Sequence, residues 1–427
     1  MNRTQRLGAL VLGAAMLGLS ALSGSAADPV VVGQLVAQTG ATAPVARVYA
    51  QGVADAFAFI NAHGGVGGRT IDLNAVDYGY EPAKAIQIYK QWKETSKPVA
   101  IQGWGTADTE ALIEYVSKDG VVFMSGSSSG HLTDPSGRSP WTSMPAPYNF
   151  FYGPSYSDGC RALVQFAAEE WKRSGVAARG STFLGDLYRP KFAYMGDNHP
   201  YPNAPKAACT DYARDLGFDV LPAIRYALSP GDFSAQCDML KESRADFAFL
   251  ANTAESNAAL VKACAKAGVS TQFLTNIYGW DESAAKQAGD AGNGVVWVVS
   301  VARWGDDVLG MKLLREISKE SDPSGQEYRS AHYIRGVCSA FLMRDAMMAA
   351  AKLGAITGPN IKKGFEEMRD HVPTGLDGVC LPSTFTGSDH RGTTTVMLYR
   401  NDYNDGSVTA QRVYQTTIPL RPDWLGW

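Results

Sequence analysis

The sequence predicts an α/β protein made of two doubly wound lobes, each built around a parallel sheet. Three observations lead to this prediction. Strand-like apolar runs alternate with helical segments from Pro29 onward, a proline-rich stretch at 137–159 interrupts the alternation, and the alternation then restarts. Strands that are joined through a helix in this way lie parallel in one sheet, with right-handed crossovers. The interruption divides the alternation into two units of similar size, and each is expected to have a parallel sheet.

The first unit opens with the strand PVVVGQLVA at 29–37, a continuous apolar run typical of a strand buried on both faces. A helix follows over about 48–62, where Tyr49, Val53 and Phe57 recur at helical spacing. The rest of the unit alternates in the same way: a strand at 70–76, a helix at 82–93, a strand at 98–102, a helix from Asp108 and a strand at 120–125.

The second unit repeats this order after the proline-rich stretch. Its expected elements are a helix at 161–172, a strand at 191–196, a helix at 204–216, a strand at 218–224, a helix at 232–242, a strand at 246–251, a helix at 255–267 and strands at 272–276 and 294–300. A helix at about 329–353 then leads to a long C-terminal segment rich in Thr, Tyr and Asp.

The first 27 residues have the order of a secretory signal peptide. Two arginines precede an apolar run at 7–22, which closes on Ser25-Ala26-Ala27. A membrane span needs roughly 20 apolar residues, and this run is shorter. No cysteine near the cleavage site could carry a lipid, so the sequence predicts export as a soluble periplasmic protein.

Composition limits the function classes. Removing Arg3 and Arg6 with the leader leaves 37 basic and 42 acidic residues, a net charge of −5, which argues against a nucleic-acid partner. The six histidines show no metal-binding spacing, and we expect neither metal nor cofactor. Six widely spaced cysteines are either buried thiols or up to three disulfides, and Cys237 with Cys264, on consecutive helices, is a possible bridge.

Four glycines stand between the first helix and the second strand, at Gly64, Gly65, Gly67 and Gly68. Glycine adopts the left-handed conformation that ends a helix without strain. A phosphate-binding loop would need its glycines before a helix, and these follow one, so they indicate a helix stop and a tight turn.

The same corner resembles a known family. Asn61 begins an Asn-x-x-Gly-Gly-x-x-Gly ending, and a strand and an Asp-x-x-x-x-Pro turn from Asp77 to Pro82 follow it. This pattern resembles type I periplasmic solute-binding proteins, in particular the leucine/isoleucine/valine-binding family of ABC transporters. Further matching segments come in the same order over most of the mature chain: TGA, VVFMSGSSS, STQFLTN, QAGDAGNGVV and FTGSDHRG.

The resemblance implies two lobes joined by a three-strand hinge that close on a small solute, with an inner-membrane permease as partner and the protein acting as a monomer. It divides the chain into a leader at 1–27, a first lobe at 28–147 and 302–384, and a second lobe at 148–301 and 385–427.

The resemblance also implies the ligand site. The loop after the fourth strand supplies hydrogen bonds to a ligand carboxylate, and its matching residues are Ser127, Ser128 and Ser129. Thr106 matches a second hydroxyl, allowing one deletion, and Tyr201 matches an aromatic residue that stacks on the ligand. Trp104, between two glycines after a strand, is expected to form a cleft wall.

The loop GSSSG also matches the Gly-x-Ser-x-Gly elbow of serine hydrolases, which leaves an exported hydrolase using Ser128 as a rival hypothesis. An elbow needs a helix directly after its serine, whereas Pro135 and Gly137 follow here. The loop composition therefore favours ligand binding, and we expect no enzyme.

The chain departs from amino-acid binders in the loop LTNIYGWDES. The position of the acid that pairs with a ligand ammonium falls near Ile277, and Asp281 or Glu282 could replace it only if the loop is shifted. The aromatic residues Tyr278 and Trp280 stand close by. A carboxylate or carbonyl compound with an apolar or aromatic body is therefore expected, with a branched-chain amino acid, an amide or a sensing role as alternatives.

Overall fold

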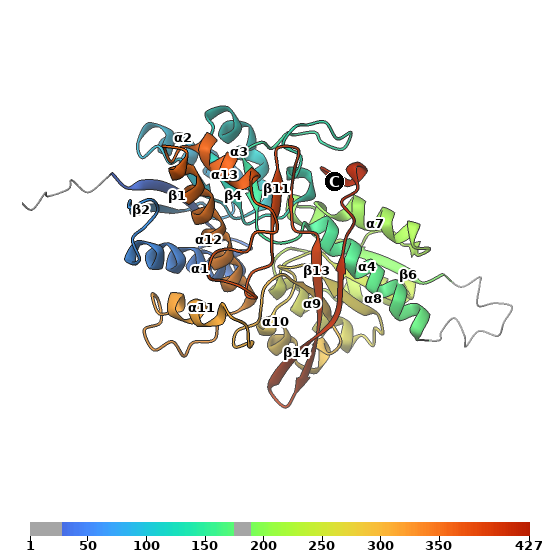
Figure 1. The fold of residues 1–427 in the computed structure, drawn as a ribbon. Coiled ribbons are helices and arrows are strands. Elements are labelled where there is room, and N and C mark those ends of the chain that lie inside the picture. The colour runs from blue at the N-terminus through green and yellow to red at the C-terminus, as the bar shows by residue number, and fades with distance from the viewer. Residues whose placement is uncertain (1–27, 175–188) are drawn as a thin grey trace, which may run out of the picture.

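The computed structural model describes residues 28–174 and 189–427, which form two lobes, each with a sheet covered by helices (Figure 1). The predicted signal peptide lies outside the described residues. The predicted fold class is confirmed, because strands and helices alternate along both lobes as the sequence indicated.

The first lobe is built on a five-stranded parallel sheet in the order β2-β1-β3-β4-β5. Its strands are β1 (Val30–Val36), β2 (Ile71–Asp77), β3 (Ala100–Gln102), β4 (Val122–Ser125) and β5 (Asn149–Phe151). Its helices are α1 (Ala43–Ala62), α2 (Pro82–Glu94), α3 (Thr106–Asp119), η1 (Gly130–Leu132), α11 (Met311–Ser318), α12 (Ala331–Lys352) and α13 (Gly358–Glu366).

The second lobe repeats the strand order in its parallel part, β7-β6-β8-β9-β10, and then adds an antiparallel hairpin. Its strands are β6 (Lys191–Met195), β7 (Asp219–Val220), β8 (Phe247–Leu250), β9 (Gln272–Thr275), β10 (Val296–Val299), β13 (Thr395–Asn404) and β14 (Ser407–Thr417). Its helices are α4 (Tyr156–Arg173), α6 (Pro200–Asn203), α7 (Lys206–Asp215), α8 (Ser234–Ser243), α9 (Ala254–Lys266), α10 (Glu282–Ala288), η2 (Gly289–Gly292) and η3 (Pro422–Trp424).

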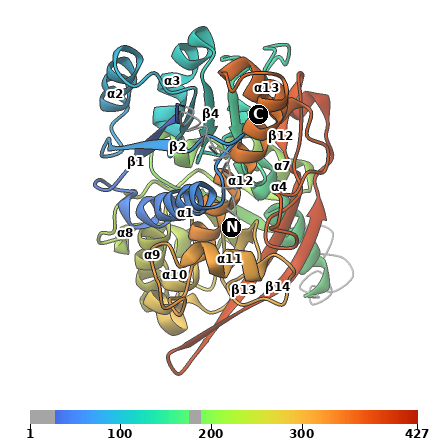
Figure 2. The ribbon, with the colours of Figure 1, turned by 60° about the vertical axis from the view of Figure 1, so that its left-hand side comes forward.

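The C-terminal hairpin β13–β14 is the main addition to the predicted fold. It extends along the edge of the second lobe and past its end (Figure 2). Its inner strand pairs with β10 and buries Val396, Met397 and Leu398, whereas the outer strand is largely exposed. The sequence showed that this segment is rich in Thr, Tyr and Asp but did not predict the hairpin.

The chain crosses between the lobes where Tyr152 ties the crossing segments together. Its hydroxyl donates to the carbonyl of Ser300 at 2.7 Å and accepts from the backbone N–H of Leu381 at 2.7 Å. The lobe boundaries themselves stay a prediction. Strand β5 lies just beyond the predicted boundary at residue 147 and yet pairs with β4, and a short hairpin of β11 (Thr384–Thr386) and β12 (Asp389–Gly392) packs beside β5 and α13.

Two glycines bring helices α1 and α12 into backbone contact. A Cβ atom at Gly52 would lie 2.1 Å from the Tyr333 carbonyl oxygen, and one at Gly336 would lie 2.2 Å from the Tyr49 oxygen. Both helices are buried on the facing sides. This close crossing fixes α12 against the edge of the cleft, which matters for the site below.

The glycine-rich corner is a helix stop followed by a tight turn, as predicted. Helix α1 ends at Ala62, and Gly65 has a φ of +67° with no room for a side chain, since a Cβ would lie 2.0 Å from the Arg69 oxygen. The Asn61 amide then bonds both the N–H and the C=O of Ile71 and so aligns the start of β2.

All six cysteines are paired in the described residues, as Cys160–Cys209, Cys237–Cys264 and Cys338–Cys380. The second pair is the bridge that the sequence suggested, and it joins the neighbouring helices α8 and α9. Within residues 28–174 and 189–427, no helix combines the length and apolarity that a membrane crossing requires.

Candidate functional site

The candidate site lies where the carboxyl ends of the two sheets face each other. In a doubly wound sheet, ligands bind at the switch point where the strand order reverses. Loops from these switch points converge here: Thr42 follows β1, Trp104 follows β3, Tyr201 follows β6 and Thr253 follows β8.

These loops enclose a small cavity with a volume of only ≈ 10 Å³, which is enough for about one water molecule. The lobes are therefore closed on each other. The lining is aromatic and hydroxylic, and it consists of Thr42, Tyr80, Trp104, Gly105, Thr106, Tyr156, Tyr201, Thr253 and Tyr278.

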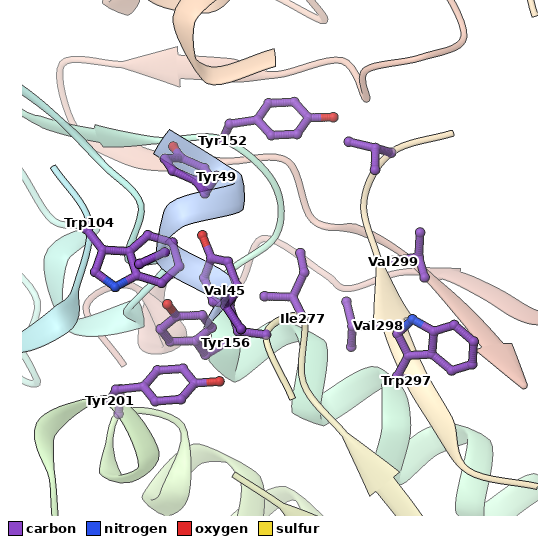
Figure 3. Close-up of a cluster of buried hydrophobic side chains, with 14 of the residues drawn as sticks. Val45, Tyr49, Trp104, Tyr152, Tyr156, Tyr201, Ile277, Trp297, Val298 and Val299 are labelled. Carbon is purple, nitrogen blue, oxygen red and sulfur yellow. The ribbon is translucent and has the colours of Figure 1, made fainter. Parts of the chain in front are cut away.

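Aromatic rings from both lobes pack around this cavity. Figure 3 shows Trp104, Tyr156 and Tyr201 gathered together from three different elements. Trp104 meets Tyr278 edge-on with 5.0 Å between ring centroids, and Tyr156 meets Tyr201 edge-on at 5.4 Å. The Trp104 indole donates to the Thr42 hydroxyl at 3.0 Å, which fixes the ring orientation.

A row of hydroxyls lies along the first-lobe side of the cavity. The Oγ1 of Thr106 and the Oγ of Ser127 are 2.7 Å apart, and Ser127 also accepts from the backbone N–H of Ser129 at 3.3 Å. The Oγ of Ser129 is buried without a partner in the described residues, while Ser128 lies next to the guanidinium of Arg335. The serine loop thus carries donors that the protein does not use fully.

Two hydrogen bonds join the lobes beside the cavity, one of them from the backbone N–H of Tyr156 to the carbonyl of Ser128 at 2.8 Å. The Tyr278 hydroxyl, from the second lobe, donates to the carbonyl of Gly126 at 2.7 Å in the first lobe. Tyr201, by contrast, donates to Asn276 at 2.7 Å within its own lobe. Tyr278 therefore reports directly on closure.

The structure brings together most of the residues that the sequence suggested. Trp104, Thr106, Tyr201 and Tyr278 line the cavity, and Ser127, Ser128 and Ser129 stand directly behind Thr106 or beside Arg335. Trp280 does not join them. Its indole is buried in the second lobe against Gly292 and donates to Asn401 at 2.9 Å, so the structure places it in the core of that lobe.

Several site residues were not found from the sequence. Tyr156 lies within the proline-rich stretch, where periodicity gave no signal, and Tyr80 lies in the turn after β2. His332 and Arg335 come from α12, and with Ser339 they place polar side chains at three- and four-residue spacing on a buried helix. This polar face on a buried helix is the feature of the sequence that could have identified His332 and Arg335 as site residues.

The surroundings of Ser128 differ from those of a hydrolase nucleophile. Its side chain is fully buried, and its hydroxyl lies 3.4 Å from a guanidinium nitrogen of Arg335. The three-residue helix η1 follows the loop where an elbow would continue into a full helix. The loop geometry favours ligand binding over a nucleophilic role.

No acidic side chain is among the residues that line the cavity in the described structure. Asp281 caps helix α10 instead, by accepting from the N–H of Ala284 at 2.8 Å, and burial raises the pKa of its carboxyl group. Asp108 accepts from the Tyr78 hydroxyl at 2.7 Å, and burial raises its pKa to about 7. A ligand ammonium in the cavity would therefore have no carboxylate beside it.

His332 separates the cavity wall from Asp281. Its ring tilts against Tyr278, with 5.5 Å between centroids, and its Nε2 lies 3.4 Å from a carboxylate oxygen of Asp281. Burial, together with the positive charge of Arg335, lowers the pKa of His332 to about 3. The imidazole is therefore neutral near pH 7, and the contact with Asp281 is not an ion pair.

In the described part of the chain, no three His, Cys, Asp or Glu side chains are grouped so that they could hold a metal ion.

Similarity to known proteins extends over most of the chain. The model of the periplasmic binding protein family matches residues 29–407. A protein from Pseudomonas aeruginosa described as an amino acid binding protein is 23% identical over 270 residues, which are 62% of this chain. The matched stretch spans 65% of the length of that relative.

Solved structures share the fold. A branched-chain amino acid ABC transporter protein from Thermus thermophilus with bound valine has a TM-score of 0.78 at 20% identity, covering 91% of this chain and 97% of its own. A fatty acid ABC transporter substrate-binding protein from Thermomonospora curvata has a TM-score of 0.74 at 18% identity, covering 90% and 92%. The resemblance inferred from the glycine-rich corner is thereby confirmed.

Proposed function

Because the chain belongs to the periplasmic binding protein family, we propose that it is the substrate-binding subunit of an ABC importer. In this role the exported, monomeric protein captures a small organic solute between its lobes. The closed form then docks on a permease in the inner membrane and releases the solute.

The observation that carries the ligand class is the acid-free aromatic cavity at the facing strand ends. Stacking on an aromatic ring contributes roughly 0.5–1.5 kcal/mol beyond the area buried. An unpaired ammonium in such a site would cost several kcal/mol, which is more than that gain. We infer a carboxylate or carbonyl compound with an apolar or aromatic body, held by the hydroxyls of Thr106 and the serine loop.

Binding must involve opening of the lobes, since the closed cavity is too small for an organic solute. The crossing segments around Tyr152 and Ser300 are the natural hinge, because few strands connect the lobes there. Opening breaks the hydrogen bond between Tyr278 and Gly126, and closure on a solute excludes water from the aromatic cavity.

A matched pair of probes tests this function. Leucine and 4-methylpentanoate differ only by the ammonium group, and phenylacetate adds an aromatic body. We expect 4-methylpentanoate or phenylacetate to raise the melting temperature and to bind in calorimetry, while leucine does little. Tight leucine binding would contradict the proposed ligand class and would make Asp281 or Glu282 the candidate ammonium partner.

An amino-acid or amide ligand is the alternative, and the description of the Pseudomonas relative favours it. A sensing module would bind a similar solute and pass the signal to a receptor. Neighbouring genes for permease and ATPase subunits would support transport over sensing.

A further inference from the structure

Arg335 is a buried cation that has no carboxylate partner among the described residues. It lies on α12 with 2% of its surface exposed, and its Nη2 is 3.4 Å from the Ser128 hydroxyl and 3.3 Å from the Tyr152 carbonyl oxygen. Its Nε and Nη1 are buried and have no acceptor in residues 28–174 and 189–427. A guanidinium stays protonated at all physiological pH values, so this charge is permanent.

Arg161 is a second buried arginine in this chain, and its contacts differ from those of Arg335. It is equally buried, but its guanidinium contacts the Asp158 carboxylate at 2.9 Å and stacks on Trp424 at 4.2 Å. Arg335 has a comparable aromatic contact, 4.2 Å from the Tyr278 ring centroid, and no carboxylate partner in the described part of the chain. Leaving a buried charge unpaired is costly, and an anionic ligand would remove that cost.

The neighbours of Arg335 add hydrogen-bond donors rather than negative charge. The hydroxyls of Ser129 and Ser300 are buried without partners among the described residues, and Ser300 and Arg335 both face Gly153. His332 is neutral and holds Asp281 on its far side. Unpaired hydroxyls and no negative charge thus stand beside the guanidinium, which is the pattern of an anion site.

The guanidinium lies one side chain away from the cavity. It stacks on Tyr278, which lines the cavity and comes from the second lobe, whereas Arg335 and Ser128 belong to the first. When the lobes part, Tyr278 leaves with its lobe and uncovers the guanidinium. The first lobe therefore presents the cation to a solute that arrives in the open form.

We propose that Arg335 anchors the carboxylate of the solute, with the hydroxyls of Ser128 and Ser129 beside it and Tyr278 closing over the ion pair. The planar guanidinium fork matches a carboxylate with two parallel hydrogen bonds. This inference rests on the proposed function and sharpens it: the ligand is an organic monocarboxylate, and the corresponding neutral amide binds poorly.

The test compares carboxylates with their amides in three variants. Calorimetry measures binding of 4-methylpentanoate against 4-methylpentanamide, and of phenylacetate against phenylacetamide, to the wild type, Arg335→Gln and Arg335→Lys. Arg344→Gln is the matched control, since Arg344 is on the same helix and pairs with Asp345 away from the cavity. We expect Arg335→Gln to weaken carboxylate binding by at least about tenfold and amide binding by less than about twofold. The lysine variant should retain part of the preference, and Arg344→Gln all of it.

The outcomes separate the anchor from the function. Equal losses for the acid and the amide would reveal a merely structural role and overturn the anchor, as would unchanged carboxylate binding in Arg335→Gln. A wild type that binds the amides and not the carboxylates would overturn the anchor while leaving solute binding intact. A wild type that binds none of these probes would count against the proposed ligand class itself, and the anchor would fall with it.

Discussion

Two hollows lie between the lobes, and they differ in nearly every property. The aromatic cavity measures ≈ 10 Å³ and carries no charged side chain in its lining, whereas an outer groove measures ≈ 870 Å³ and is rich in charge. The groove is lined by both lobes, including Arg47, Glu255, Asp281, Glu282, Lys286, Glu327 and Arg329. The lining of the groove mixes charges of both signs, so volume does not mark the binding site here; convergent rings, hydroxyls and a buried cation do.

His332 and Asp281 form the partition between the hollows. His332 touches Tyr278 on the cavity side, and Asp281 lines the groove. The acid that could have served an ammonium therefore faces away from the aromatic cavity. This arrangement links the proposed carboxylate preference to the shape of the cleft.

The largest expected effect on affinity comes from a pair of substitutions, one in the aromatic cavity and one in the outer groove. Trp104→Ala should weaken binding of 4-methylpentanoate or phenylacetate by about 30-fold, because truncating a central buried aromatic side chain costs about 2 kcal/mol or more. Tyr328→Ala, in the groove and 50% exposed, should change the affinity by less than about twofold. Calorimetry measures both, and a larger loss from Tyr328→Ala would move the binding site to the groove.

A smaller effect is expected from a bond that joins the lobes. Tyr278→Phe removes the hydroxyl that donates to Gly126, so the closed form should lose about 1 kcal/mol and the affinity should fall about fivefold. Small-angle scattering should show a larger radius of gyration for the free variant. Tyr333→Phe is the control, because its hydroxyl bonds Asp55 within the first lobe, and an equal expansion there would disprove the closure role.

A third effect, on stability and not on affinity, concerns the partition and its pH dependence. The pKa of His332 is about 3 in the folded protein and 6.5 ordinarily, so between these values the unfolded chain binds a proton that the folded one does not. Stability should therefore fall as the pH drops from about 6.5 towards 3, and His332→Asn should flatten that slope. Asp281, Glu282 and Arg335 surround the ring and remain in both proteins, so the difference between the two melting curves isolates His332. Parallel curves would show that the imidazole does not titrate in this way.

Local pattern was enough for the fold and for part of the site. Apolar runs and helical spacing predicted the two α/β lobes, since buried parallel strands and one-sided helices leave short-range signatures. The glycines after α1 predicted the turn, and loops after strand ends predicted Trp104, Thr106, Tyr201 and Tyr278 as neighbours. Carboxyl ends of parallel strands meet at one edge, so sequence position there translates directly into space.

Long-range packing decided the rest. Trp280 carries the same local signal as Tyr278, two residues before it, but the turn directs one ring into the second-lobe core and the other into the cavity. Arg335 reaches the cleft only because Gly52 and Gly336 let α12 press against α1, and its lack of a carboxylate partner among the described residues depends on every segment around it. The sequence by itself determined the elements and the edge at which they bind; the tertiary structure alone decided which side chains face the solute and where the unpaired charge lies, because these follow from contacts between residues far apart in the chain.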